Sequence, residues 1–405
     1  MTDRRNKVST SARLARAWIG VLAGVALALA VLGVLALRAP VASADSGSSP
    51  APAATQFAVD ASQSATPSLV ATFAVKPLRK GAYIGAFLPS APYKPGAIDA
   101  YKKLIRKPVS MVMWFQPWAN GPNRLDKSML ASVWQRGAIP IISWEPWSPG
   151  NTCALGAPDW RLGQITAGKY DAYITQFARD AKAAQGPIMI SPFHEMNGVW
   201  YPWGGMVNGN TPADLIAAWR HVHDIFVREG AANVTWVWSV NLRSRPDTYE
   251  NRYAAYYPGD EYVDWVGVSG FNWGRGVGGY PWWSFEAMLG QPLKYLKTLH
   301  KPIVITETAS VEQGGSKSAW LTTTFRRIRA NHPEIKAVIY FNSKEFSHGH
   351  TQDWRVNSSK RSLNAFRAAM KSKLFVGTPA SALSQWRRSL TTDEWTAVLG
   401  WPRIY

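Results

Sequence analysis

The sequence predicts an α/β fold, a (β/α)8 TIM barrel with an N-terminal transmembrane anchor or signal segment and a short C-terminal extension. Three observations support it. Eight short apolar runs alternate with eight segments of helical pattern, and polar side chains gather where the runs end. The 405 residues leave room for one domain of about 250–300 residues. Strands of a parallel barrel are buried on both faces, so continuous apolar runs are typical of them.

The apolar runs are the predicted strands. Several follow a proline, at Pro108, Pro187 and Pro302, which a strand tolerates at its first position because no ladder hydrogen bond is lost. The runs lie at residues 83–88, 109–115, 139–144, 188–193, 234–240, 263–269, 303–306 and 337–341. The predicted helices lie at 97–106, 127–135, 170–184, 212–228, 249–256, 285–299, 318–330 and 360–370, and the fifth pattern is weak. Barrel active sites lie at the C-terminal ends of the strands, so the ends of these runs indicate where function resides.

The N-terminus predicts export. Residues 1–38 combine a basic segment with an uncharged stretch at 18–37, which as a helix reaches about 30 Å and crosses a bilayer. The preceding positive charge keeps the N-terminus cytoplasmic, so we expect a single-pass protein of the cell membrane with an extracellular catalytic domain. A small-x-small pattern at 42–44 leaves open a secreted form cleaved after Ala44. Residues 39–77 form an Ala/Ser/Pro linker expected to be disordered, 78–373 the barrel domain, and 374–405 an extension of unknown role.

The amino-acid composition limits which molecules the protein is expected to bind. The formal net charge of +19 favours anionic surroundings such as a cell-wall polymer, an acidic polysaccharide or a phospholipid surface. No basic helix or zinc pattern accompanies that charge, so we expect no nucleic acid. Cys153 is the single cysteine, which excludes an intramolecular disulfide and a cysteine metal site. We expect neither metal nor cofactor, and a monomeric catalytic domain. The 21 tryptophans exceed what a core needs, which indicates an aromatic binding surface.

Two glutamates directly follow apolar runs. Glu195 comes after the fourth run and Glu307 after the seventh. In a barrel both would face one cleft. Glycoside hydrolysis needs two such carboxylates, one protonated to donate to the leaving oxygen and one ionised to attack or to activate water. The retaining route requires them about 5–5.5 Å apart.

The segment around Glu195 resembles a known family. Residues 192–204, PFHEMNGVWYPWG, resemble the acid/base segment of glycoside hydrolase family 26, a (β/α)8 family of clan A that contains β-mannanases and β-1,3-1,4-glucanases. The resemblance covers roughly residues 80–372. It implies that Glu195 is the acid/base and that Glu307, in PIVITE at 302–307, is the nucleophile. It also implies that His194 contacts the nucleophile or the sugar in the cleaved subsite, and that Trp200 is the subsite tryptophan.

Further segments add substrate-binding candidates. Residues 142–147, ISWEPW, resemble the family's third strand end, and 353–356 resemble the segment after the eighth strand. Glu145 is predicted to accept a hydrogen bond from a sugar hydroxyl, with a structural hydrogen-bond partner as the alternative. Aromatic residues near strand ends suit stacking on pyranose rings, each contributing about 1–2 kcal/mol by area. The stacking and contact candidates are Trp114, Trp144, Trp200, Phe271, Asn272, Trp273 and Trp354.

One position departs from the family pattern. Many members have a tyrosine at the end of the sixth strand whose hydroxyl holds the nucleophile, and the aligned residue is Phe271. Glu307 then needs another donor, such as Asn272 in a shifted register, or the enzyme has a lower rate or another substrate.

These features predict an exported retaining glycoside hydrolase, endo-β-mannanase-like or endo-β-glucanase-like, that cleaves β-linked polysaccharide by double displacement. Anchoring favours the cell's own exopolysaccharide as substrate. The alternative is a non-hydrolytic carbohydrate-binding or polysaccharide-assembly protein on a glycosidase-like barrel, which the tether, the basic surplus and Phe271 favour.

Overall fold

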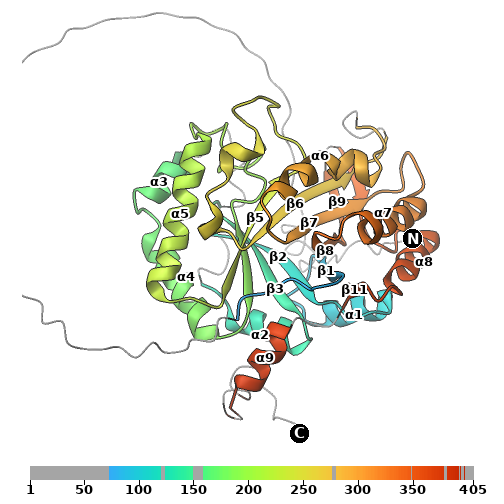
Figure 1. Ribbon diagram of the computed structural model, residues 1–405, viewed down its shortest axis with the longest axis horizontal. Coiled ribbons are helices and arrows are strands. Elements are labelled where there is room, and N and C mark those ends of the chain that lie inside the picture. The colour runs from blue at the N-terminus through green and yellow to red at the C-terminus, as the bar shows by residue number, and fades with distance from the viewer. Residues whose placement is uncertain are drawn as a thin grey trace, which may run out of the picture. The chain divides into compact units, whose positions relative to one another are not determined.

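Eight parallel strands close into a barrel in the computed structural model, which describes residues 73–119, 124–148, 158–275, 280–347, 349–377 and 381–391 together with Asp393 and Thr396 (Figure 1). The strands follow one another in chain order, and β1 pairs with both β2 and β8, which closes the ring. The predicted barrel is therefore confirmed. The strands are β1 (Ala82–Phe87), β2 (Met111–Pro117), β3 (Ile139–Glu145), β4 (Ile188–Pro192), β5 (Val234–Asn241), β6 (Trp265–Asn272), β7 (Ile303–Ser310) and β8 (Ile335–Phe341).

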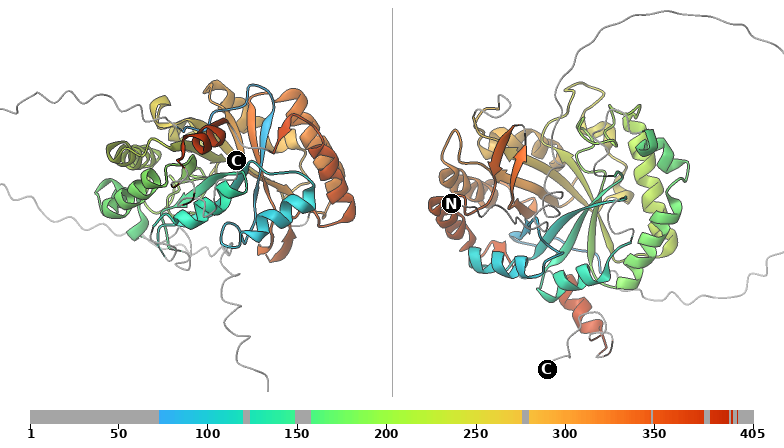
Figure 2. Two further views of the ribbon diagram at one scale, coloured as in Figure 1. Left: turned by 90° about the horizontal axis from the view of Figure 1, so that it is seen from below. Right: turned by 180° about the vertical axis from the view of Figure 1, so that it is seen from behind.

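Helices surround the barrel, as the two views of Figure 2 show. The weak helix expected at 249–256 is wrong, because two short 3-10 helices, Tyr253–Tyr256 and Asp260–Tyr262, connect β5 to β6. Tyr257 precedes Pro258, and a residue before proline disfavours the helical region, so no helix continues there. The helices are α1 (Gly96–Ile105), α2 (Lys127–Gln135), α3 (Leu162–Thr166), α4 (Asp171–Ala184), α5 (Pro212–Glu229), α6 (Phe285–Thr298), α7 (Lys317–Asn331), α8 (Lys360–Met370) and α9 (Ser381–Ser389).

The core has two layers. Side chains that alternate along each strand fill the barrel interior, among them Met111, Met113, Ile139 and Ile141. The other face of each strand packs against the helices. Val75 belongs to the interior cluster, and its backbone bonds Thr235 Oγ1 (2.9 Å) and Trp265 Nε1 (2.7 Å) at the N-terminal ends of β5 and β6. The segment before β1 therefore closes the lower end of the barrel.

The folded domain is wider than the predicted limits of 78–373. Val75 lies in the stretch predicted as linker, and β11 (Phe375–Val376), in the stretch predicted as extension, pairs with β1. Helix α9 packs outside the barrel, where the Trp386 ring lies 4.7 Å from Trp134 of α2. A short hairpin, β9 (Lys344–Ser347) and β10 (His350–Asp353), follows β8.

The predicted anchor or signal segment at 1–38, and the linker up to residue 72, lie outside the described residues. Among the helices that the structure does describe, none combines the length and apolar character that a membrane span requires.

Candidate active site

Glu195 lies three residues beyond β4, in a loop that turns back over the barrel. Phe193 and Glu195 have φ of +53° and +55°, which is a backbone region that residues other than glycine adopt only under constraint. The Glu195 amide donates to the carbonyl of Ser239 in β5 (2.9 Å), which helps to hold this conformation. The turn directs the Glu195 side chain toward β5 and β6.

Both oxygens of Glu195 have partners, and the residue is 8% exposed. Asn241 Nδ2 donates to Oε1 (2.9 Å) and Trp200 Nε1 donates to Oε2 (2.7 Å). Ser269 Oγ also bonds Oε1. A hydroxyl can donate or accept, so the Ser269 contact is compatible with an ionised and with a protonated Glu195. These contacts fix the carboxyl group in one orientation.

A β-bulge directs Glu307 into the barrel. The pairing of β6 with β7 shifts between Val268 and Ser269, so that Ser269 pairs with Glu307 and Thr306 is the extra residue. Thr306 itself bonds Ser239 across the interior (2.7 Å). Strict alternation would turn the next residue outward, whereas the extra residue lets Thr306 and Glu307 both face inward.

The Glu307 carboxylate is buried and lacks a strong donor. The residue is 6% exposed, and its side chain forms no hydrogen bond within the described part of the chain; His194 Nδ1 lies 3.8 Å from Oε1. Burial raises the pKa of Glu307 well above its usual value, and the negative charges of Glu195, Glu145 and Glu345 raise it further. Glu307 therefore ionises at a higher pH than an ordinary glutamate does.

Glu145 and His194 form a buried pair beside Glu307. Glu145 Oε1 lies 3.0 Å from His194 Nε2, and Oε2 accepts from Trp147 Nε1 (3.0 Å). Both oxygens are thus used by the protein, the arrangement expected of a structural partner. A carboxylate only accepts, so Nε2 carries the proton, and the buried Nδ1 faces Glu307 without a hydrogen bond.

An aromatic wall stands on the β6 and β8 side. The Phe271 ring lies 5.2 Å from both Phe341 and Trp354, and Trp273 lies 5.0 Å from Trp354. Phe271 and Trp273 are half-buried, whereas Trp354 is fully buried and supports them, so the prediction that Trp354 stacks on a sugar is wrong. Asn272 cannot replace the missing tyrosine hydroxyl, because its side chain bonds Ser310 Oγ and the Trp283 amide, each at 2.9 Å.

Two further predicted stacking residues do not reach the cleft. Trp114 and Trp144 are buried in the layer between the barrel and the helices. Trp144 stacks on Phe177 of α4 at 4.4 Å and donates to the Tyr173 hydroxyl (3.1 Å). Each follows an inward-facing position on its strand and so points outward. The prediction that they bind sugar is wrong.

Two further residues complete the site. Tyr201, next to Trp200, stacks on Trp203 at 4.3 Å; burial raises its pKa, and the charges of Glu195, Glu145 and Glu307 add to this. Glu345 of the β9–β10 hairpin accepts from Trp354 Nε1 (3.0 Å), and burial raises its pKa. The WYPW segment could have indicated Tyr201. Glu345 lies four residues after the eighth strand, where its position alone was the available signal.

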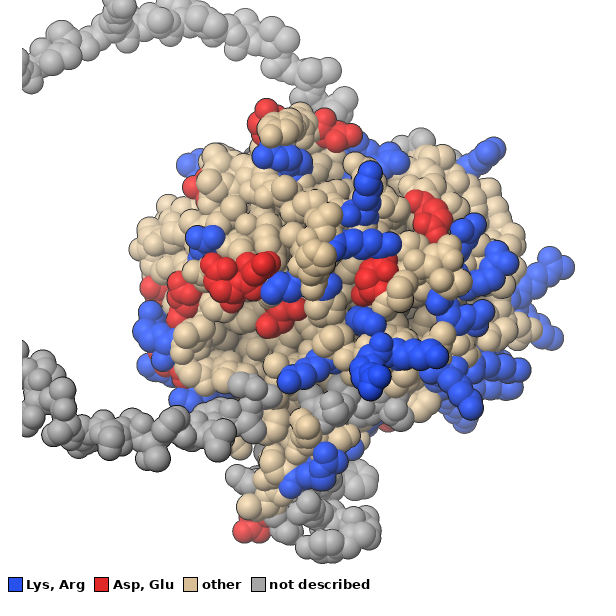
Figure 3. All heavy atoms as spheres, in the orientation of Figure 1, with Lys and Arg blue, Asp and Glu red and all other residues tan. Residues whose placement is uncertain are grey.

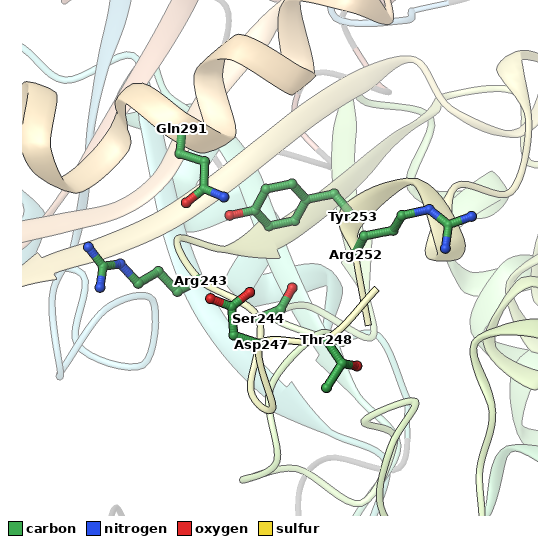
Figure 4. A pocket seen from close by; sticks show the side chains of 7 residues that line it. All are labelled: Arg243, Ser244, Asp247, Thr248, Arg252, Tyr253 and Gln291. Carbon is green, nitrogen blue, oxygen red and sulfur yellow. The ribbon is translucent and has the colours of Figure 1, made fainter. Parts of the chain in front are cut away.

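A small pocket lies beyond the end of β5, lined by residues of the following loop and by Gln291 of α6 (Figure 4). Arg243, in that lining, has its guanidinium 4.3 Å from the ring centroid of Trp283. The Arg243 amide donates to Asn241, the residue that bonds Glu195. The loop that lines the pocket therefore adjoins the carboxylate site.

One carboxylate lies after β4 and one on β7, both at the C-terminal end of a parallel barrel. This arrangement places the protein among barrels that have the two carboxylates typical of glycosidases.

The model of the family described as glycosyl hydrolase family 26 matches residues 162–274. The chain is 36% identical over 295 residues to endoglucanase H of Acetivibrio thermocellus, a match that covers 72% of this chain and 30% of that protein. It is 25% identical over 214 residues to a mannan endo-1,4-β-mannosidase of Bacillus subtilis, covering 46% and 51%. The chain belongs to glycoside hydrolase family 26, and the matches span 30% and 51% of the length of these two relatives.

Solved structures agree on the fold. A family 26 β-mannanase from Bacteroides ovatus superposes with a TM-score of 0.55 at 18% identity, covering 74% of this chain and 90% of that one. An endo-β-1,4-mannanase double mutant from Cellulomonas fimi gives 0.57 at 16%, covering 75% and 73%. At these identities the likeness establishes the shared barrel.

Proposed function

We propose that this protein is a retaining glycoside hydrolase that cleaves β-linked polysaccharide of the β-glucan or β-mannan type. The observation that carries the proposal is the convergence of Glu195 and Glu307 on one end of the barrel, joined through Ser269, which bonds Glu195 and pairs with Glu307. The names of the relatives, an endoglucanase and mannan endo-1,4-β-mannosidases, favour this substrate class.

The proposed reaction has two displacements. Glu307 attacks the anomeric carbon while Glu195 donates its proton to the glycosidic oxygen; the bond to the leaving sugar breaks and a glycosyl ester forms on Glu307. Glu195, now a carboxylate, then takes a proton from a water molecule whose oxygen attacks the same carbon and releases Glu307. Trp200 and Asn241 hold Glu195 in place through both steps.

The proposed roles of Glu195 and Glu307 require one proton on the pair, held by Glu195. With Glu195 protonated, one of the charges that raise the pKa of Glu307 disappears, and Glu307 can ionise. Because the pKa of Glu307 is raised and the attacking carboxylate must be ionised, activity should be lost as pH falls through that pKa. The acidic limb of the kcat/KM profile then lies above the usual range of a glutamate.

Export is part of the proposal, supported by the uncharged stretch at 18–37 behind a basic segment. A protein held at the cell surface acts close to that surface, so the cell's own exopolysaccharide is one proposed substrate.

Incubation with a panel of β-glucans, β-mannans and self-derived polysaccharide, followed by product sizing, tests the activity. We expect oligosaccharides from at least one polymer, and an initial product with the anomeric configuration of the substrate by proton NMR. Inverted product would exclude the double displacement, and no product from any polymer would contradict the hydrolase.

The lack of a hydrogen-bond donor on Glu307 favours a second candidate, a non-hydrolytic carbohydrate-binding or polysaccharide-assembly protein. That protein would retain affinity for a glycan by calorimetry and release no reducing ends during long incubation.

Glu145→Gln is expected to move the acidic limb of kcat/KM to lower pH. Trp147 only donates, so the glutamine oxygen must accept from it and the NH2 group must face His194 Nε2. Nδ1 then carries the proton toward Glu307. This donor and the lost negative charge both favour an ionised Glu307. The pH profile of kcat/KM measures the shift.

Two further variants serve as controls. Glu345→Gln removes the charge that raises the pKa of Glu307 least and should give a smaller shift in the same direction. Glu334→Gln, a residue that bonds Lys297 and His332 outside the site, should give none. A limb that stays in place or rises in Glu145→Gln would contradict the proposed pairing.

A further inference from the structure

The end of the barrel opposite the carboxylates carries an unpaired positive charge. Six exposed side chains form what we call the basal basic face: Arg106, Arg326, Arg327, Arg329, Lys371 and Lys373. Helices α7 and α8 contain no acidic residue, and none of the six takes part in an ion pair within the described part of the chain. Figure 3 shows blue side chains gathered on the side where Figure 1 labels α7 and α8, with little red among them.

These residues lie together because three helices end there. Lys107 Nζ, just after α1, donates to the carbonyl of Met370 at the end of α8 (2.8 Å). The Phe325 ring on α7 lies 5.2 Å from Phe375, and the Ala82 amide, at the start of β1, bonds the Leu374 carbonyl (2.8 Å). The last turns of α1, α7 and α8 therefore meet at the N-terminal ends of the strands.

The chain enters the domain at this same end. Val75 bonds the first residues of β5 and β6, and the exposed Arg79 and Lys80 follow it. The 72 residues before the described domain include the stretch at 18–37 that predicts a membrane segment. A domain tethered from its basic end would meet the bilayer with that end first.

We propose that the basal basic face docks on anionic phospholipid head groups, so that the carboxylate end of the barrel points away from the membrane. The inference rests on the anchoring part of the proposed function. Lysine and arginine side chains near an anionic leaflet are attracted within about a Debye length, roughly 10 Å at 0.1 M salt. The tether keeps the domain near the surface, and the charge selects the face that contacts it.

The test uses the full chain in nanodiscs of phosphatidylcholine with and without phosphatidylglycerol. A soluble amine-reactive reagent and mass spectrometry report the exposure of individual lysines. We expect labelling of Lys371 and Lys373 to fall several-fold in the anionic discs and to recover at high salt, while Lys344, exposed on β9 at the other end, stays unchanged. Equal labelling in both discs, or equal protection of Lys344, would overturn the proposal.

Matched variants distinguish an effect of the basal basic face from an effect of the protein's net charge. R326E/R327E/R329E should abolish the protection. K127E/R161E/K360E makes the same charge change on exposed residues at the starts of α2, α3 and α8, and should keep the protection. Loss in both would assign the effect to net charge alone. Protection by soluble poly(glycerol phosphate) but not by the discs would assign the face to a wall polymer and overturn the lipid docking.

A second binding measurement and an activity measurement complete the test. If the chain does not insert into discs, cosedimentation with phosphatidylglycerol vesicles measures docking directly, and binding equal in both triple variants would contradict it. Hydrolysis of a soluble glycan by the triple variants tests the proposed activity separately, and we expect it to match the unaltered chain.

Discussion

Glu307→Ala is expected to lower kcat/KM for polysaccharide cleavage on the order of 10⁴-fold or more, because removal of a nucleophile abolishes the covalent route. The bulge between Val268 and Ser269 gives Glu307 its inward direction, so no neighbouring carboxylate occupies the same position on β7. Reducing-end release from the preferred polymer, followed over long incubation, measures the loss.

Azide provides a sharp control for this variant. A small anion that enters the space left by the Glu307 side chain attacks the same face of the anomeric carbon, so the glycosyl azide should have inverted configuration. Glu250→Ala, an exposed glutamate in the loop after β5, should keep full activity. Activity within tenfold of the unaltered enzyme in Glu307→Ala would rule out the nucleophile assignment.

Glu195→Ala is expected to lower kcat/KM on polysaccharide by about 10²–10⁴-fold, the usual contribution of a general acid. The effect should depend on the leaving group. The phenolate of an aryl glycoside with an acidic phenol leaves without protonation. The glycosylation step with such a substrate should therefore be nearly unaffected, while deglycosylation slows. Burst kinetics with such a substrate, compared with steady-state rates on the polymer, measures both steps.

Trp200→Phe gives a matched comparison, because it removes the N–H that bonds Glu195 Oε2 and keeps an aromatic ring. We expect a loss smaller than that of Glu195→Ala. Equal losses on activated and natural substrates in Glu195→Ala would contradict the acid/base role.

The barrel was predictable from the sequence because its signal is repeated. Parallel strands buried on both faces produce continuous apolar runs, and eight such runs fall within a few residues of the observed strands. The ends of the fourth and seventh runs located Glu195 and Glu307 for the same reason. Elements that lack this repetition were less predictable, as the 3-10 helices between β5 and β6 show.

Side-chain direction was not predictable from proximity to a strand end. Trp144 lies next to the end of β3 and Trp114 lies in the middle of β2, and the two-residue alternation turns both toward the helices. Glu307 faces inward only because of a bulge, which depends on the pairing of two strands distant in sequence. Glu345 reaches the site through a hairpin whose folding back over the barrel has no periodic signal.

The left-handed backbone at Phe193 and Glu195 has a consequence for folding. Such conformations cost on the order of 1–3 kcal/mol each in residues other than glycine, against a total of about 5–15 kcal/mol for a typical domain. Selection for stability alone would place glycine at position 195. The glutamate proposed as the acid/base therefore lowers the stability of its own fold, and a glycine at position 195 should raise the melting temperature while removing the carboxyl group.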